Sequence, residues 1–343
     1  MSNEVRVLVR ADTRQAQADI DHFSDSVGSG LGTATKIGIA AVAGLGAAAA
    51  GGLAVSINAA ANFQQALSQV AAVSGATKTE LDGLHDTALR IGKDTAFSAT
   101  EAANAMEELA AQGVSATDIM GGAADATVAL AAAGGTDLVT AATAASSAMN
   151  IWHLSTSNLT DVVNRLTGAA NVSSFGVEDM TLAMAAGGIA ASTFKISMED
   201  TTTALAALAK GGFQSGSDAG TSFKAMMTAL AAPVGTGAKT IAALGINVRD
   251  ASGAMLPMKD IIAELHARLD DLSQEDRDAA MSKIFGSDGM RAAGALMQIT
   301  GEQFQAMSDQ MGATDAAGVA AVRMDNFKGS LEQLKGSLEV IEI

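Results

Sequence analysis

The stretch SATEAANAMEELAAQG, residues 98–113, carries every signal of one short helix. Ser98 and Glu101 have the spacing of a capping box, in which a hydroxyl and a carboxylate bond the free backbone N–H groups at a helix start. Alanine, the strongest helix former, dominates the residues that follow, and apolar side chains recur on one face. Gly113 is typical of a helix end. The stretch therefore predicts a single helix with a defined beginning and end.

The same signals recur along much of the chain. Start signals with Glu or Asp in the last place are found at Thr77–Glu80, Ser115–Asp118, Ser197–Asp200 and Ser273–Asp276. Glycines suited to helix ends are found at Gly121–Gly122, Gly134–Gly135, Gly187–Gly188 and Gly211–Gly212. These signals predict an all-α fold, an array of short antiparallel helices of about 12 to 18 residues joined by short turns. Some of the glycine pairs could instead lie inside helices that pack closely against a neighbour.

The composition agrees with a helical fold and argues against several classes of function. Of the 343 residues, 48% are hydrophobic but only 3% are aromatic, which favours close packing of small side chains. The net charge of −16 argues against a protein that binds nucleic acid by neutralising phosphates. The chain has no cysteine, which excludes disulfides, thiol nucleophiles and thiolate metal sites.

Four segments follow from these patterns. We expect a strand, a helix and a glycine-rich joint in residues 1–35, a hydrophobic helix in 36–60, a helical core in 61–325 and a coiled-coil-like helix in 326–343 that continues in a longer parent protein. Within the core, Pro233–Lys239 is predicted to be a loop, and residues 245–257 a small β-hairpin around the turn residues Asp250 and Gly253. Residues 276–285 and 290–299 are predicted to be separate helices.

The second segment contains IGIAAVAGLGAAAAGGLAVSI, residues 37–57, an uncharged run long enough to cross a bilayer as a helix. Its strongly apolar members, worth about −2 to −4 kcal/mol together on an insertion scale, are Ile37, Ile39, Val42, Leu45, Leu53, Val55 and Ile57. A stripe of small residues that suits close helix packing consists of Ala40, Gly44, Ala48, Gly52 and Ser56. The run therefore fits either a marginal transmembrane helix or a buried helix of a bundle.

No pattern in the sequence indicates catalysis. The four histidines, His22, His85, His153 and His266, are far apart and do not form the HExxH zinc motif. Residues 235–240, GTGAKT, lack the glycines and the Gly-Lys pair of a phosphate-binding loop. A GxSxG nucleophile motif is absent from the sequence. We therefore predict no enzyme activity, no catalytic residues, no metal site and no cofactor.

Several longer stretches resemble the core region of phage tail tape measure proteins, and the resemblance covers about residues 63–335. They are FQQALSQVAAVSGAT at 63–77, GFQSGSDAGTSFKAMMTAL at 212–230, LGINVRDASGAMLPMKDIIAEL at 244–265, IFGSDGMRAAGAL at 284–296 and DNFKGSLEQLKGSLE at 325–339. The family-motif positions that we single out within them are Gly220, Asp250, Gly253, Phe285 and Gly286.

The resemblance implies a structural protein in the lumen of the phage tail tube. Such proteins act as a ruler for tube assembly and tail length, and they leave ahead of the DNA and assist genome delivery across the host membrane. The implied partners are the tail tube protein, tail assembly chaperones, tail tip proteins, further copies of the chain and, during infection, the host membrane, with no sequence-specific nucleic acid. A pore-forming helical toxin or a membrane-inserting component of an injection system is the alternative, and an envelope-degrading enzyme carried on the tail is a third class.

Overall fold

The structure is a computed structural model that describes residues 46–325, with side chains described from residue 59 onward. The chain divides into two compact units, Met1–Ser56 and Ile57–Ile343. The strand and helix expected in residues 1–35, the helix expected in 326–343 and the first part of the uncharged run, 37–45, lie outside the described residues. The rest of that run is helical backbone, and its side chains also lie outside the described set.

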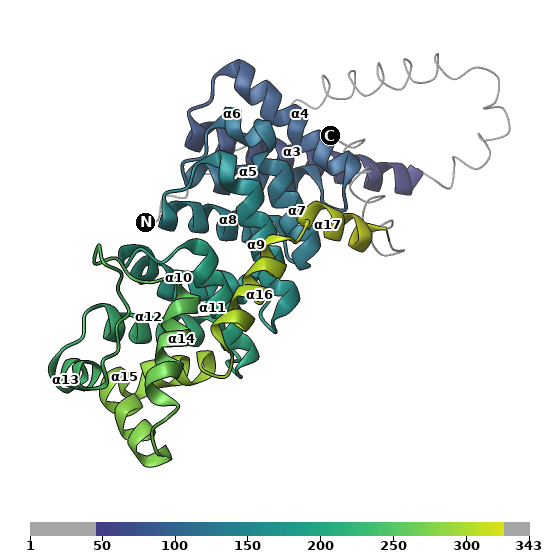
Figure 1. The fold of residues 1–343 in the computed structure, drawn as a ribbon. Coiled ribbons are helices and arrows are strands. Elements are labelled where there is room, and N and C mark those ends of the chain that lie inside the picture. Colours follow the sequence, from purple (N-terminus) through teal and green to yellow (C-terminus); the bar gives the residue numbers. More distant parts are fainter. Residues whose placement is uncertain (1–45, 326–343) are drawn as a thin grey trace, which may run out of the picture. The chain divides into compact units, whose positions relative to one another are not determined.

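The described residues fold as helices joined by short connections, as the sequence predicts (Figure 1). The helices are α3 (Gly46–Ser74), α4 (Lys78–Asp94), α5 (Ala99–Ala111), α6 (Ala116–Asp118), η2 (Ile119–Ala123), α7 (Ala124–Gly134), α8 (Leu138–Trp152), η3 (Thr156–Asn158), α9 (Leu159–Val172), α10 (Val177–Thr193), α11 (Met198–Lys210), α12 (Gly216–Ala231), α13 (Gly235–Leu244), α14 (Met258–Leu269), α15 (Gln274–Leu296), α16 (Gly301–Gly312) and α17 (Ala316–Met324).

The helix starts confirm the capping signals. Before α5, the Ser98 N–H donates to Glu101 Oε2 at 2.8 Å, and the Glu101 N–H donates to Ser98 Oγ at 3.2 Å. The same reciprocal pair forms between Thr77 and Glu80 before α4, where the backbone hydrogen bond from Thr77 lowers the pKa of the Glu80 carboxyl. The hydroxyls of Ser115, Ser197 and Ser273 likewise accept the backbone N–H three residues on.

One of the glycine pairs does not end a helix. Gly187 and Gly188 lie inside α10. Neighbouring helices approach so closely at these two positions that a larger residue would not fit without a shift. Gly121 and Gly122 lie in η2, between α6 and α7, where the non-helical backbone of Gly122, with φ 132°, separates two helices. Gly187–Gly188 was therefore wrong as a helix end, and close packing explains why glycines occur there.

The predicted loop at residues 233–239 is also wrong, because α13 begins at Gly235. Gly237 is buried in this first turn, and a Cβ there would lie 3.1 Å from the carbonyl oxygen of Lys283. Tertiary packing therefore outweighs the low helix propensity of a glycine-rich sequence. At 245–257 the expected hairpin is reduced to one antiparallel bridge between Arg249 and Met255, and no strand forms in residues 46–325.

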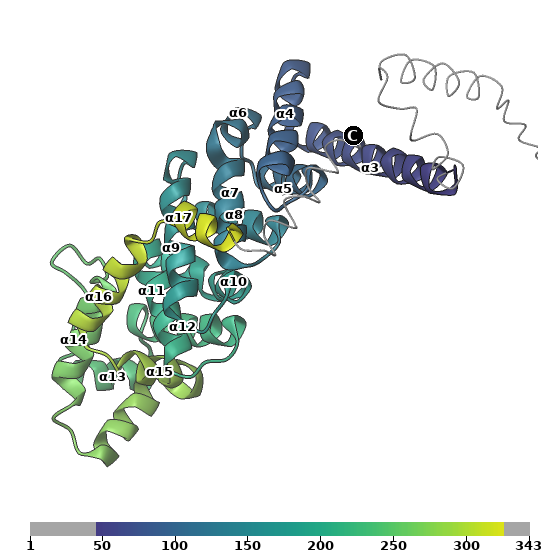
Figure 2. The ribbon, with the colours of Figure 1, turned by 90° about the vertical axis from the view of Figure 1, so that its right-hand side faces the viewer.

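The second unit has one continuous hydrophobic core of alanine, leucine, methionine and a few phenylalanines. α12 packs against α10 on one side and α15 on the other. After α15 the chain runs back along the earlier helices (Figures 1 and 2). α16 packs against α9, α11 and α14, and α17 packs against α7. Contacts between helices far apart in sequence therefore hold the array together.

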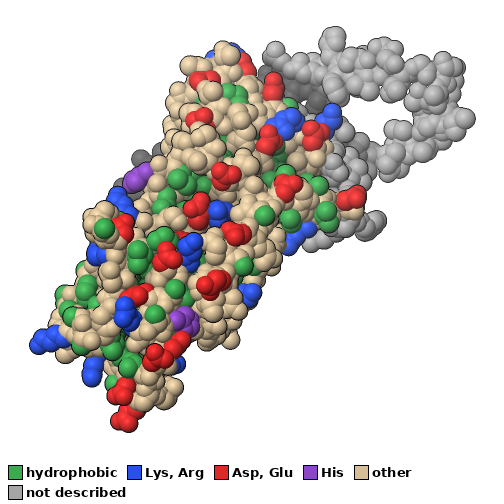
Figure 3. Space-filling model, in the orientation of Figure 1, with side chains coloured by type: hydrophobic (Ala, Val, Ile, Leu, Met, Phe, Trp, Pro, Cys, Tyr) green, Lys and Arg blue, Asp and Glu red, His purple; other side chains and the backbone are tan. Residues whose placement is uncertain are grey.

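The surface carries mixed charges. On the face drawn in Figure 3, acidic and basic side chains are interspersed, and hydrophobic side chains show between them. This face has no continuous basic patch of the kind that nucleic-acid-binding proteins present.

Candidate functional site: a glycine-packed layer and its groove

Two of the family-like stretches meet at the contact between α12 and α15. Residues 212–230 form most of α12, and residues 284–296 form the second half of α15, which packs against it. A Cβ on Gly289 of α15 would lie 3.0 Å from the backbone nitrogen of Met226, so the two backbones nearly touch. The sequence resemblance is thus concentrated where helices approach most closely.

On its other side α12 packs against α10 through further glycines. Cβ atoms on Gly216 and Gly220 would collide with the backbone of Asp179 and of Ala183, respectively. The Gly216 N–H also donates to Asp179 Oδ1 at 3.1 Å. Gly220, one of the predicted motif positions, is therefore a packing residue that permits backbone-to-backbone contact.

An ion pair between Asp218 of α12 and Arg291 of α15 links the two helices at the solvent-exposed edge of their contact. The guanidinium of Arg291 donates to both carboxylate oxygens of Asp218, at 2.9 and 2.6 Å, and lies 4.6 Å from the ring centroid of Phe213. The Arg291 hydrogen bond lowers the pKa of the Asp218 carboxyl and raises that of the guanidinium. A bidentate, stacked arginine fixes geometry in a way that lysine cannot.

Phe285 and Gly286 mark a kink in α15. The two helices predicted at 276–285 and 290–299 are separated by this kink, where Gly286 has the non-helical backbone angles φ 64° and ψ −169°. Residues other than glycine rarely adopt this backbone conformation. The ring of Phe285 is buried, so the motif builds a bend and anchors it in the core.

Beside this kink lies a groove of about 470 Å³ between α12, α13 and α15. We call it the α12–α15 groove; its lining includes Lys224, Thr228, Val234, Lys283, Phe285 and Gly286. Val234, at the start of α13, is 80% exposed. The groove is a shallow, mainly apolar depression with two lysines, and no catalytic constellation lines it.

The other two motif positions, Asp250 and Gly253, form a turn outside the groove. Asp250 Oδ1 accepts the N–H groups of Ser252 and Ala254, at 2.8 and 3.0 Å, and the hydrogen bond from the Ser252 hydroxyl lowers the pKa of this carboxyl. Gly253 has φ 85°. Both positions therefore serve the geometry of the turn.

Arg249, which the sequence did not single out, ties this turn to α12. Its guanidinium donates to the carbonyl oxygens of Gly253 and Ala231, each at 2.6 Å. All five motif positions thus have structural roles on or near α12.

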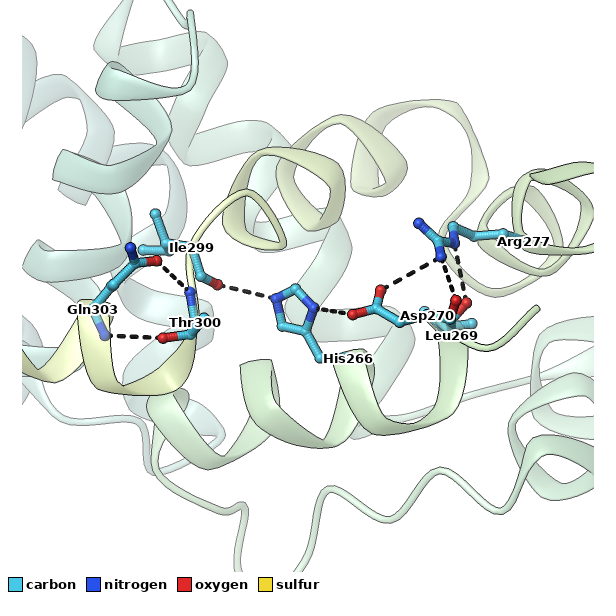
Figure 4. Close-up of polar contacts among 7 residues, drawn as sticks. All are labelled: His266, Leu269, Asp270, Arg277, Ile299, Thr300 and Gln303. Carbon is cyan, nitrogen blue, oxygen red and sulfur yellow. Dashed lines mark hydrogen bonds and ion pairs between the residues drawn. The ribbon is translucent and has the colours of Figure 1, made fainter. Parts of the chain in front are cut away.

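His266 takes part in another structural contact that the sequence did not predict (Figure 4). Its Nδ1 lies 2.7 Å from Asp270 Oδ2, and its Nε2 lies 3.1 Å from the carbonyl oxygen of Ile299. Arg277 donates to the carbonyl oxygens of Leu269 and Asp270, at 3.0 and 2.8 Å. Because the second ring nitrogen faces a backbone carbonyl and no nucleophile, this His–Asp pair fastens α14 to the connection before α16.

The described residues also offer no preformed metal site and no straight membrane span. No group of three His, Asp or Glu side chains converges within the described range. No single helix there is long and apolar enough to cross a membrane, although the pair formed by residues 116–134 and 138–152, bent by 114°, has the length and composition. Much of this pair is buried in the core, as expected of core helices in general.

The described residues form an all-α array in which the distinctive residues position helices. A sequence model of the family described as phage-related minor tail protein matches residues 85–286, and the chain belongs to this family. The matched region runs from α4 to the kink at Gly286. Membership implies a structural role in the phage tail.

Two curated relatives agree with this assignment. The chain is similar to the tape measure protein of Pneumococcus phage Dp-1, with 30% identity over 84% of this chain and 25% of the relative. It is also similar to the probable tape measure protein of Escherichia phage P2, with 25% identity over 97% of this chain and 42% of the relative. The chain thus spans less than half the length of each. No solved structure matches the chain.

Proposed function

We propose that this chain acts in a phage tail as the helical core of a tape measure, around which the tail tube assembles and which contributes to tail length. The observation that carries the proposal is the 30% identity to a tape measure protein along most of the chain, together with the family match at residues 85–286. The tail tube protein, tail assembly chaperones and tail tip proteins are the proposed partners, and the tube lumen is the proposed location.

The structure supports a role based on contacts. Its capped helices, glycine-mediated packing and mixed surface charges suit a protein that assembles with others. The negative net charge of −16 suits a surface past which DNA moves without binding, because like charges repel.

The test is tail length in the phage that encodes the chain. An in-frame deletion of residues 57–325 should shorten the tails, because a ruler loses up to about 1.5 Å for each helical residue removed. The matched control is Gly220→Ala, which disturbs packing at constant chain length and should reduce the number of tails without changing their length. Tails of normal length after the deletion would refute the ruler role of this region.

We also propose that residues 37–57 assist genome delivery across the host membrane. The support is the uncharged run itself, whose length matches a bilayer-spanning helix and whose insertion energy is marginal. Deletion of residues 37–57 should leave tails assembling and reduce the amount of DNA delivered to cells. Normal infectivity of this deletion would remove the membrane role.

A further inference from the structure

One face of α10 is apolar and exposed. Leu182 is 46% exposed and Ile189 67% exposed, and Ala185 between them is also exposed. No charged residue occurs from Met180 to Phe194. The rest of the helix packs against α12, α8, α11 and α9, whereas Leu182, Ala185 and Ile189 remain exposed among the described helices.

The order of side chains along this face is symmetric. Leu182 and Ile189 are equally distant from the midpoint between Ala185 and Ala186, which gives the order large, small, small, large. A two-fold axis through that midpoint would place Leu182 of one copy against Ile189 of a second, antiparallel copy, twice. Ala185 of each copy would meet at the centre, where a small side chain lets two helices approach. An interface that matches itself in this way is the kind that symmetric dimers use.

The charges at the two ends favour the antiparallel arrangement. Exposed Glu178 lies in the first turn of α10, and exposed Lys195 follows the last turn. In an antiparallel pair each Glu178 approaches the end that carries Lys195, whereas a parallel pair would bring Glu178 beside Glu178. Charges at a rim set orientation more than affinity.

The net charge of the chain also favours this face as the site of contact between two copies. At −16, two copies repel each other over most of their surfaces, and the repulsion is smallest where an uncharged stripe is flanked by charges of opposite sign. We propose that α10 pairs with α10 of a second copy, antiparallel, through Leu182, Ala185 and Ile189. This pairing is independent of the proposed tail role, because the purified chain alone suffices to test it.

Cysteine cross-linking tests the geometry, since the chain has no cysteine of its own. Ala185→Cys lies next to the proposed axis and should form disulfide-linked dimers under mild oxidation. Leu182→Cys should not, because its two copies would be about 10 Å apart along the helix axis, beyond disulfide reach. Mixing Leu182→Cys with Ile189→Cys should restore the cross-link. Self-linking of Leu182→Cys would indicate a parallel pair and overturn the proposal.

Sedimentation at increasing concentration tests the energetics. The wild-type chain should sediment as a dimer, and Ile189→Lys, which places a charge on both sides of the axis, should raise the dissociation constant at least about tenfold. The matched control is Val322→Lys, an exposed valine of α17 away from this face, which should dimerise as the wild type does. The proposal fails if the wild type remains monomeric up to about 100 μM, or if folded Ile189→Lys dimerises as well as the control.

Discussion

Gly187 of α10 and Gly220 of α12 face each other across a contact with no room for a side chain. A Cβ on Gly187 would lie 2.7 Å from the carbonyl oxygen of Gly220, and a Cβ on Gly220 would collide with the carbonyl of Ala183. Neither glycine has a positive φ, so the requirement comes from the neighbouring helix. Such pairs let α10 and α12 pack backbone to backbone.

Gly220→Ala should therefore destabilise the fold by about 1 to 3 kcal/mol, the usual cost of forcing an extra group into a packed interior. The matched control is Gly294→Ala in α15, where a Cβ would meet nothing within 4 Å. This control should gain up to about 1 kcal/mol, because alanine favours a helix more than glycine. Urea unfolding monitored by circular dichroism measures both variants, and equal stabilities would contradict the packing argument.

Gly286→Ala should destabilise the chain for a different reason. The backbone at Gly286, with φ 64° and ψ −169°, strains any L-residue by about 1 to 3 kcal/mol. Nothing lies within 4 Å of a Cβ built there, so a clash cannot be the cause. The measurement is again urea unfolding, with Gly294→Ala as the control in the same helix. Unchanged stability with increased helical signal would show that the kink is dispensable.

The sequence predicted features governed by local physics. The caps at Thr77 and Ser98 act within four residues, so their pattern is visible in the chain itself. The Thr300–Gln303 capping box was missed because only Glu and Asp were accepted in its last position. The all-α class and the family followed from such local signals and from the order of the longer stretches.

Contacts between distant segments were not predictable in the same way. Gly187 has the sequence appearance of a helix end, and only α12 shows that it lies inside a helix. Arg249 reaches Ala231, and His266 reaches Ile299, across 18 and 33 residues of chain. The partner of a glycine or an arginine depends on topology, which the periodicity of the sequence does not specify.

The Asp218–Arg291 pair should make stability depend on pH. Because Arg291 lowers the pKa of Asp218 in the folded chain, the pair stabilises the fold above the ordinary Asp value of 3.8 and loses this contribution as the pH falls below it. Both side chains are about half exposed, so the effect should not exceed about 1 kcal/mol.

The comparison is Asp218→Asn against the wild type, unfolded in urea near neutral pH and again at about pH 3. The difference in unfolding free energy should shrink at the lower pH and in high salt. Arg291→Lys keeps the charge but loses the bidentate geometry and the contact with Phe213. Its unfolding free energy near neutral pH should therefore lie between those of the wild type and Asp218→Asn. A difference that stays constant with pH would exclude the ion pair as its source.

The last prediction concerns Asp200, whose Oδ2 accepts the Met258 N–H at 2.8 Å and so caps α14 from another helix. Pro257, at the N-cap position of α14, has no side-chain acceptor of its own. Asp200→Ala should therefore cost about 1 kcal/mol, as the loss of a cap usually does. Asp200→Asn keeps an acceptor oxygen and should be tolerated.

The charge of Asp200 should have the opposite effect to that of Asp218. Burial raises the pKa of the Asp200 carboxyl despite the bond from Met258, so its contribution to stability is fully present below the ordinary value of 3.8 and is lost as the pH rises through the raised value. Asp200→Asn should thus equal or exceed the wild type in stability at neutral pH and lose that advantage in acid. The control is Asp276→Asn, which removes an exposed carboxylate from the matching position of α15 and has no distant N–H to cap. If Asp200→Ala and Asp200→Asn unfold alike, then Met258 does not depend on this acceptor, and the link between α11 and α14 rests on apolar packing alone.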